Sequence, residues 1–216
     1  MQLLNLLDIN TVFFTILGYP VSVLEFTGTV LYFASVYLIS RKMILTWPVG
    51  IVSVILYAVL FYQVQLYSDM LEQSYYLVIS VIGWITWKKT KRNEKTIPSF
   101  WGTPKLIAGW AGLTALATLI LAFAVSRFHI WMPTFFPEPA DFPRLDALTT
   151  IMSLVAMYLI TVRRNEGWIY WIIVDVIGIG LYWHKNVRFI ALQYVFLLIM
   201  AAYGLYYWAK KKEQPS

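Results

Sequence analysis

One short segment combines residue types that can do chemistry in an otherwise apolar context. The segment WIYWIIVD, residues 168–175, carries Trp168, Trp171 and Asp175 at spacings of three and four residues. In an α-helix these side chains share one face, which Tyr182 continues. Asp175 lies about 10 Å along the axis from Trp168, at 1.5 Å per residue. A carboxylate so far inside an apolar helix is costly unless it binds something, and we interpret this face as a binding surface.

The chemistry that suits this face is recognition of a flat aromatic cation. Indole stacks on such a ring, a carboxylate favours its charge, and amide side chains bind its hydroxyl groups. Polar residues of other helical segments that could join the face are Gln73, Gln193, Tyr194, Ser53 and Tyr57. Other readings stay open, because tryptophans also anchor helices at membrane interfaces and buried Asp or Gln side chains also clamp helices together.

Catalytic and metal chemistry has little support in the sequence. The chain has no cysteine, and its two histidines, His129 and His184, have no partners at metal or triad spacing. There is no glycine-rich phosphate loop. We therefore expect no catalytic residues, no metal site and no cofactor.

Composition is typical of a membrane protein. Of the 216 residues, 60% are hydrophobic and 18% aromatic, and only 13% are charged. Apolar runs near the roughly 20 residues that cross a bilayer recur between short polar breaks. The sequence predicts an all-α integral membrane protein with seven transmembrane helices, at residues 21–40, 46–64, 67–87, 105–126, 146–162, 168–184 and 189–209.

The basic residues predict an orientation in the bilayer. If the first helix runs inward, thirteen of the 17 Lys and Arg residues fall inside, and four fall outside, namely Arg127, Arg144, Lys185 and Arg188. The positive-inside rule then predicts an external N-terminus and a cytoplasmic C-terminus. Because the charge gathers at helix ends, we expect no nucleic-acid partner. Residues 1–20 contain no Lys or Arg, and they are expected to lie at the membrane interface.

The two ends of the chain resemble each other. Residues 47–89 can be laid on residues 168–211, with a one-residue slip between helices. The matched pairs are Trp47 with Trp168, Gln73 with Gln193, Gly83 with Gly204, and Trp87 with Trp208. This pattern predicts two parallel three-helix repeats. The expected organisation is an interfacial segment at 1–20, repeats at 21–87 and 146–209, a connector helix with external loop at 88–145, and a basic tail at 210–216.

The segment 168–175 also fits a family signature. WIYWIIVD matches Trp-x-x-Trp-x-x-x-Asp/Asn and resembles the PnuC family of vitamin transporters. The likeness extends to FYQVQLYSDMLEQSYYLVISVIGWITW and ALQYVFLLIMAAYGLYYW, and it covers about residues 21–212. It implies a 3+1+3 arrangement of helices like that of the SWEET proteins, a homotrimer in the bacterial inner membrane, and facilitated diffusion with intracellular trapping by phosphorylation. It assigns ligand binding to Trp168, Trp171 and Asp175, and more weakly to Gln73, Gln193 and Tyr194.

The resemblance leaves the vitamin open. Nicotinamide riboside carriers of this family include members with Asn at the last signature position, where this chain has Asp175. We expect a nicotinamide riboside carrier. Because Asp175 departs from those members, a thiamine carrier of the same fold is the alternative. A non-transporting membrane receptor is a further alternative from another functional class, and an integral-membrane enzyme has no motif in its favour.

Overall fold

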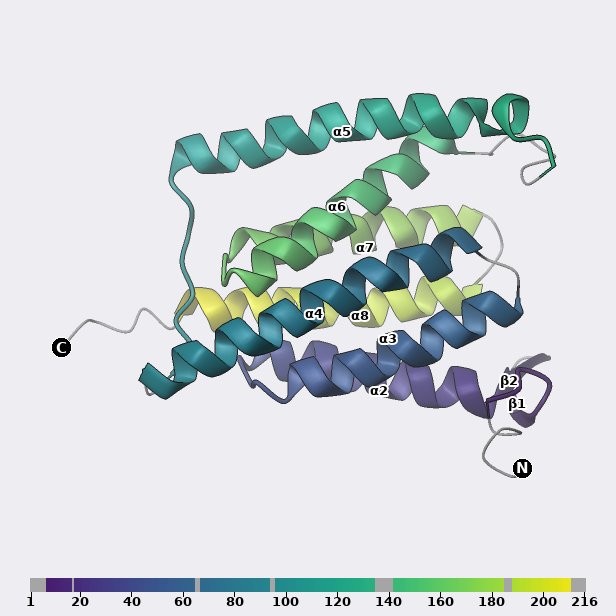
Figure 1. The fold of residues 1–216 in the computed structure, drawn as a ribbon, viewed down its shortest axis with the longest axis horizontal. Coiled ribbons are helices and arrows are strands. Elements are labelled where there is room, and N and C mark those ends of the chain that lie inside the picture. The colour runs from purple at the N-terminus through teal and green to yellow at the C-terminus, as the bar shows by residue number, and fades with distance from the viewer. Residues whose placement is uncertain are drawn as a thin grey trace. The chain divides into compact units, whose positions relative to one another are not determined.

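The computed structural model describes residues 7–16, 18–64, 67–93, 96–134, 142–184 and 188–210. Within these ranges the chain forms a short β-hairpin followed by seven α-helices (Figure 1). The strands are β1 (Val12–Ile16) and β2 (Tyr19–Ser22). The helices are α2 (Val23–Ser40), α3 (Thr46–Gln63), α4 (Tyr67–Asn93), α5 (Pro104–Trp131), α6 (Pro143–Thr161), α7 (Glu166–His184) and α8 (Arg188–Lys210).

All seven predicted helices are present, and two of their ends differ from the predicted ends by more than three residues. Helix α4 continues beyond residue 87 to Asn93, because Lys91 and Arg92 are good helix formers and suit the negative end of the helix dipole. Helix α5 continues beyond residue 126 to Trp131. The α4 extension is polar, and the α5 extension begins at Arg127, where the apolar run is interrupted.

The N-terminal segment contains a β-hairpin that the all-α prediction did not include. Strands β1 and β2 pair antiparallel, and Gly18 between them has φ +84°, a conformation that glycine adopts without strain. The hairpin leads directly into α2, where the Ser22 hydroxyl accepts a hydrogen bond from the Glu25 N–H at 3.1 Å and caps the helix. Of the predicted interfacial segment and basic tail, residues 1–6 and 211–216 lie outside the described residues.

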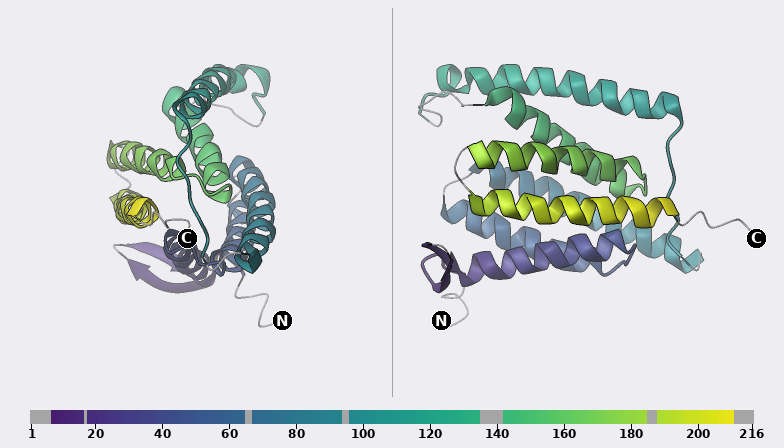
Figure 2. Two further views of the ribbon diagram at one scale, coloured as in Figure 1. Left: turned by 90° about the vertical axis from the view of Figure 1, so that its left-hand side faces the viewer. Right: turned by 180° about the vertical axis from the view of Figure 1, so that it is seen from behind.

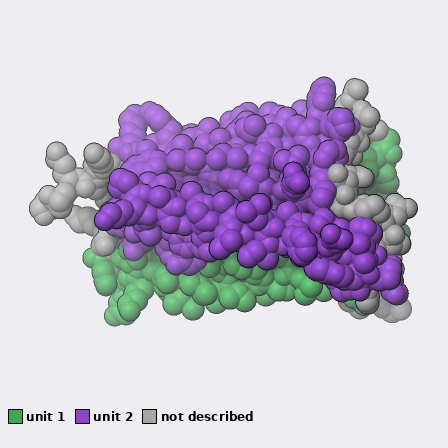
Figure 3. Space-filling model, turned by 90° about the horizontal axis from the view of Figure 1, so that it is seen from above, with its two compact units in different colours: residues 1–98 green, residues 99–216 purple. Residues whose placement is uncertain are grey.

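The chain divides into two compact units, residues 1–98 and 99–216 (Figure 3). In the first unit α3 packs against both α2 and α4. In the second unit α5 packs on α6, α6 on α7, and α7 on α8. Figure 2 shows α7 and α8 side by side along their length, in yellow-green and yellow.

The turn between α2 and α3 and the turn between α6 and α7 have the same backbone geometry. Lys42 follows α2 with φ 56°, and Arg163 follows α6 with φ 65°. Around each, equivalent N–H to carbonyl bonds close the helix end: Lys42 to Ile39, Met43 to Leu38, Arg163 to Ile160 and Arg164 to Leu159, at 2.7–2.9 Å. These are αL helix ends made without glycine. Each pair of equivalent residues has the sequence spacing that separates Trp47 from Trp168.

A tryptophan pair ties the second and third helices of the first unit together. The rings of Trp47 on α3 and Trp87 on α4 meet edge to face, with centroids 5.2 Å apart and planes at 85°. Both rings are buried. A Cβ atom on Gly83 would lie 2.3 Å from the Trp47 ring, so only glycine lets α4 approach it this closely. This contact fixes how α3 and α4 cross.

Most helices match the dimensions of a bilayer. In the described ranges, α2, α3, α5, α6 and the part Ile190–Lys210 of α8 are long and apolar enough to cross a membrane. Helices α4 and α7 are long enough but carry more polar residues, including Asp69 and Glu72 in α4 and Glu166 and Asp175 in α7. Polar residues in a membrane protein gather on helices that line sites, so these two helices are where a site is expected.

Candidate functional site

Helix α7 contains Trp168, Trp171 and Asp175, whose predicted common face we call the signature face. The helix runs without interruption from Glu166 to His184, and Asp175 lies in its middle among residues that are mainly apolar or aromatic. Asp175 is 2% exposed, and its carboxylate takes part in no hydrogen bond or ion pair within the described ranges. Trp171, one turn earlier, is half-buried. The arrangement therefore places a carboxylate without a protein partner next to an indole that is only partly covered.

Trp168 has a packing environment that differs from that of Trp171. Its ring is 2% exposed and meets Trp208 of α8 edge to face, with centroids 5.5 Å apart and planes at 83°. A Cβ atom on Gly204 would lie 2.7 Å from this ring. The contact reproduces the one between Trp47, Gly83 and Trp87 in the first unit. Trp168 therefore joins α7 to α8, whereas Trp171 keeps an accessible face.

Tyr194 of α8 lies close to the same face of α7. A Cβ atom on Gly178 would lie 2.5 Å from its ring, and the ring stacks on Tyr182 with centroids 5.4 Å apart and planes at 19°. Gly178 follows Asp175 by three residues, so Tyr194 covers α7 one turn beyond the carboxylate. Gln193 is half-buried, and as the preceding residue it points about 100° away around α8.

Two predicted residues of the first unit are engaged in helix packing. The Ser53 hydroxyl on α3 donates a hydrogen bond of 2.9 Å to the carbonyl of Gly28 on α2. The Tyr57 hydroxyl lies 2.8 Å from the Thr29 hydroxyl, also on α2. Both side chains therefore hold α2 against α3, which is the structural alternative for polar groups in apolar helices.

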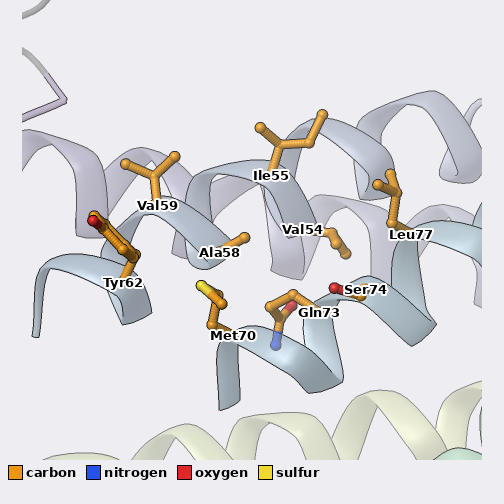
Figure 4. A pocket seen from close by; sticks show the side chains of 9 residues that line it. All are labelled: Val54, Ile55, Ala58, Val59, Tyr62, Met70, Gln73, Ser74 and Leu77. Atoms are coloured by element: carbon orange, nitrogen blue, oxygen red, sulfur yellow. The ribbon is translucent and has the colours of Figure 1, made fainter. Parts of the chain in front are cut away.

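Gln73 borders a groove of the first unit between α3 and α4. The groove has a volume of about 290 Å³, and its lining residues are Val54, Ile55, Ala58, Val59, Tyr62, Met70, Gln73, Ser74 and Leu77. Figure 4 shows Val54 and Ala58 on the α3 side and Met70 and Gln73 on the α4 side. The Gln73 amide donates a long hydrogen bond of 3.4 Å to the Asp69 carbonyl of its own helix. The groove is thus mainly apolar, with an amide that makes only a weak contact.

The predicted site residues fall into two groups. Trp168, Trp171, Asp175, Gln193 and Tyr194 belong to the second unit, and Ser53, Tyr57 and Gln73 belong to the first. Within the second unit the structure brings Tyr194 to the Asp175 face.

Several buried polar residues of the second unit are not among the predicted ones, and two of them touch α7 or belong to it. The Thr114 hydroxyl on α5 lies 3.2 Å from the Tyr170 hydroxyl on α7. Glu166 is 6% exposed at the start of α7. Its position just before the signature was the available signal, but an acidic residue at a helix start usually serves as a cap.

Metal chemistry finds no support in the side chains that the structure describes. No three His, Cys, Asp or Glu residues come together in the described ranges in a way that could hold a metal ion. The His184 ring meets Phe142 edge to face at 5.9 Å, so it serves packing at the end of α7. On and next to α7 the second unit brings together an acid, Asp175, an indole, Trp171, and two tyrosines, Tyr182 and Tyr194.

A family model described as nicotinamide mononucleotide transporter matches residues 22–210 of the chain. The match covers all seven helices and the signature face.

Characterised relatives agree with this match along most of the chain. The nicotinamide riboside transporter PnuC of Escherichia coli is 28% identical over 211 residues, covering 88% of this chain and 87% of the relative. The riboflavin/roseoflavin transporter RibM of Streptomyces davaonensis is 24% identical over 195 residues, covering 89% of this chain and 87% of the relative. A crystal structure of the vitamin B3 transporter PnuC is similar in fold, with a TM-score of 0.64 at 24% identity, over 87% of this chain and 80% of that one.

Proposed function

Because the chain belongs to the nicotinamide mononucleotide transporter family, which includes the PnuC proteins, we propose that this multi-pass membrane protein carries nicotinamide riboside. The observation that carries the proposal is Asp175, a buried carboxylate with no hydrogen-bonding partner among the residues that the structure describes, one turn from the half-buried indole of Trp171. The pyridinium ring of the riboside is flat and positively charged. A carboxylate and an indole face favour such a ring, and a neutral ring would gain only the stacking.

The charge of the site also supports a riboside over its phosphorylated form. A phosphate group needs Arg or Lys, or backbone N–H groups at a helix N-terminus. Helix α7 itself contains no Lys or Arg. The nearest basic residues before it, Arg163 and Arg164, lie in the turn between α6 and α7. On either side of Asp175 in the sequence of α7, the residues are apolar or aromatic. A phosphate bound at this face would meet the carboxylate, and α7 offers no Lys or Arg to compensate it.

The proposed ligand face consists of Trp171 and Asp175, with Tyr194 and Gln193 from α8. Trp168 contributes by joining α7 to α8 and so orienting the face, since its ring packs against Trp208 and Gly204. Gln73 of the first unit remains a candidate contact because its amide is only weakly engaged. Ser53 and Tyr57 act in this proposal through the packing of α2 on α3.

Thiamine is the second candidate substrate. It is also an aromatic cation, and Asp175 favours it for the same electrostatic reason. The similarity to a riboflavin transporter adds a neutral ring system as a third ligand for comparison. A neutral ring gains nothing from the charge of a carboxylate, so it ranks below the two cations.

Transport is proposed to occur by facilitated diffusion through a 3+1+3 arrangement, with accumulation driven by intracellular phosphorylation. The support for two repeated units is the geometry that recurs at one sequence spacing: the αL turns at Lys42 and Arg163 and the two edge-to-face tryptophan pairs. The homotrimer that the PnuC resemblance implies belongs to the same proposal.

A binding titration tests the substrate. Nicotinamide riboside, its 5′-phosphate, thiamine and riboflavin are each titrated into the purified protein, and the affinity is obtained from the heat of binding. We expect nicotinamide riboside to bind most tightly and its 5′-phosphate to bind at least about tenfold more weakly, a difference of roughly 1.4 kcal/mol. If thiamine binds more tightly, thiamine becomes the proposed substrate, and the proposed transport mechanism is unchanged. Binding of none of these ligands would reject the proposal.

A further inference from the structure

The linker that leads into α5 is held on the turn between α6 and α7. The Phe100 N–H donates to the Arg163 carbonyl at 3.0 Å, and the Asn165 N–H donates to the Phe100 carbonyl at 3.0 Å. Phe100 and Arg164 thereby form a parallel β-bridge. The linker is therefore an ordered part of the second unit at the point where the signature helix begins.

Side chains add further bonds to this contact. The Arg164 guanidinium donates to the Trp101 carbonyl at 3.1 Å, and the Ser99 hydroxyl donates to the Trp208 carbonyl at 3.2 Å. The Gly102 N–H donates to Oε1 of Glu166. Because Glu166 is the first residue of α7 and Trp208 lies near the end of α8, the linker touches both helices of the candidate site.

Glu166 makes the most specific of these contacts. Its side chain is 6% exposed, and Gly102 is its one hydrogen-bonding partner within the described ranges, since Oε2 has none. A Cβ atom at position 102 would lie 2.7 Å from Oε1. An added methyl group at this position would therefore displace the end of the Glu166 side chain from its present place. Burying a carboxylate is costly, and one hydrogen bond offsets only part of that cost. We therefore look for a role of Glu166 in addition to capping the helix.

The first unit lacks this contact although its turn has the same geometry. At the spacing that relates Lys42 to Arg163, the residue equivalent to Glu166 is Leu45, which is 55% exposed. The αL turn therefore does not require an acid at this position. What distinguishes the second unit is that its next helix carries Trp171 and Asp175.

We infer that Glu166 is a positioning residue for the ligand face: by holding the linker at Gly102 it sets the orientation of α7, and with it Trp171 and Asp175. Glu166 precedes Trp171 by five residues on one uninterrupted helix, so a shift of its first turn moves the indole. The role in recognition rests on the proposed function, whereas the hydrogen bond between linker and helix does not.

Four variants separate the hydrogen bond from charge and from packing. Glu166→Ala removes the acceptor, and Glu166→Gln keeps an oxygen that can accept from Gly102. Gly102→Ala keeps the carboxylate but pushes it away through the new Cβ atom. Leu45→Ala is the matched control, because it truncates the equivalent position of the other turn.

Two measurements are made on each purified variant. Hydrogen–deuterium exchange reports residues 99–103 and the first turns of α7, and titration with nicotinamide riboside and thiamine reports binding. In Glu166→Ala we expect exchange of both segments to rise at least about tenfold and affinity for the bound vitamin to fall roughly fivefold to tenfold. Gly102→Ala should change both in the same direction. Glu166→Gln and Leu45→Ala should stay within about twofold of the parent in both.

Each outcome decides a different point. Faster exchange in Glu166→Ala with unchanged affinity overturns the positioning role and leaves a structural bond. Equal damage from Glu166→Gln and Glu166→Ala overturns the hydrogen-bond mechanism. If the parent binds neither vitamin, the proposed function fails, and the exchange data alone decide whether Glu166 orders α7. If Glu166→Ala does not fold, Gly102→Ala and Glu166→Gln carry the same comparison.

Discussion

At the scale of single residues, two tryptophans of one signature have different environments. Trp168 is enclosed by Trp208 and Gly204, whereas Trp171 is half-buried beside Asp175. The same packing around Trp47 in the first unit, which has no acid on the following turns of α3, shows that this tryptophan contact is sufficient as a structural element. Ligand recognition by Trp171 and Asp175 therefore stays a prediction, and Trp168 has a packing role that needs no ligand.

Asp175→Asn and Trp171→Ala test this assignment. Asn keeps the size and hydrogen-bonding capacity of Asp but removes the charge, so a cationic vitamin should bind less tightly. Loss of the charge or of the stacking contact should each cost on the order of 1–3 kcal/mol, or roughly tenfold to a hundredfold in affinity, measured by titration. A neutral nucleoside serves as the control and should not respond to Asp175→Asn. If cation binding is the same in Asp175→Asn and lost in Trp171→Ala, stacking alone carries recognition.

Gly204→Ala tests the packing of Trp168. The new methyl group would lie 2.7 Å from the indole, and overpacking of this kind costs roughly 1–3 kcal/mol. We expect a lower melting temperature of the purified protein, and the same for Gly83→Ala at Trp47. The matched control is Gly112→Ala, where nothing lies within 4 Å of the added Cβ. A melting temperature of Gly204→Ala at or above that of Gly112→Ala would contradict the packing.

At the scale of elements, the turns after α2 and α6 show how one geometry is used twice. Both place a basic residue in the αL conformation, Lys42 at φ 56° and Arg163 at φ 65°. A side chain in this region is strained. Glycine would relieve the strain. A basic residue at this position adds to the positive charge expected on the cytoplasmic side. The Arg163 guanidinium also lies over the Phe100 ring, 5.7 Å from its centroid.

Lys42→Gly is therefore expected to raise stability. Relief of αL strain is worth on the order of 1 kcal/mol, partly offset by the greater entropy of glycine in the unfolded chain. The measurement is the melting temperature of the purified variant. Lys89→Gly, in the helical part of α4, is the control and should lower stability by about 1 kcal/mol. A loss of stability in both variants would mean that the Lys42 side chain stabilises the turn in another way.

At the scale of the whole molecule, the predicted orientation can be tested because the chain has no cysteine. Single cysteines are introduced at Asn10, which is exposed ahead of the hairpin, and at Lys89, which is exposed near the end of α4. From the distribution of basic residues we expect an impermeant thiol reagent to label Asn10→Cys in intact cells and Lys89→Cys only after permeabilisation. The reverse pattern would invert the topology.

Transport is expected to run without an ion gradient. Helix α7 carries Asp175 as the one acid in its interior, and a coupled pump commonly uses a series of titratable groups. In proteoliposomes without a kinase, the vitamin should equilibrate across the membrane and an uncoupler should not change its final distribution. Accumulation above the external concentration that the uncoupler abolishes would show coupling. Liposomes without the protein are the control for carrier-dependent flux.

The sequence by itself determined the helices and the signature face, because apolar runs of membrane length and a spacing of three and four residues are local properties of the chain. It also paired Trp47 with Trp168 and Gly83 with Gly204. The tertiary structure decided what each of these does. Trp168 of α7 packs against Trp208 of α8, and Tyr194 of α8 packs against Tyr182 of α7. The Ser53 hydroxyl donates a hydrogen bond to the Gly28 carbonyl, and the Glu166 carboxylate accepts one from the Gly102 N–H. Such contacts join residues far apart in the chain, and their partners depend on how closely two helices approach, which no local pattern specifies.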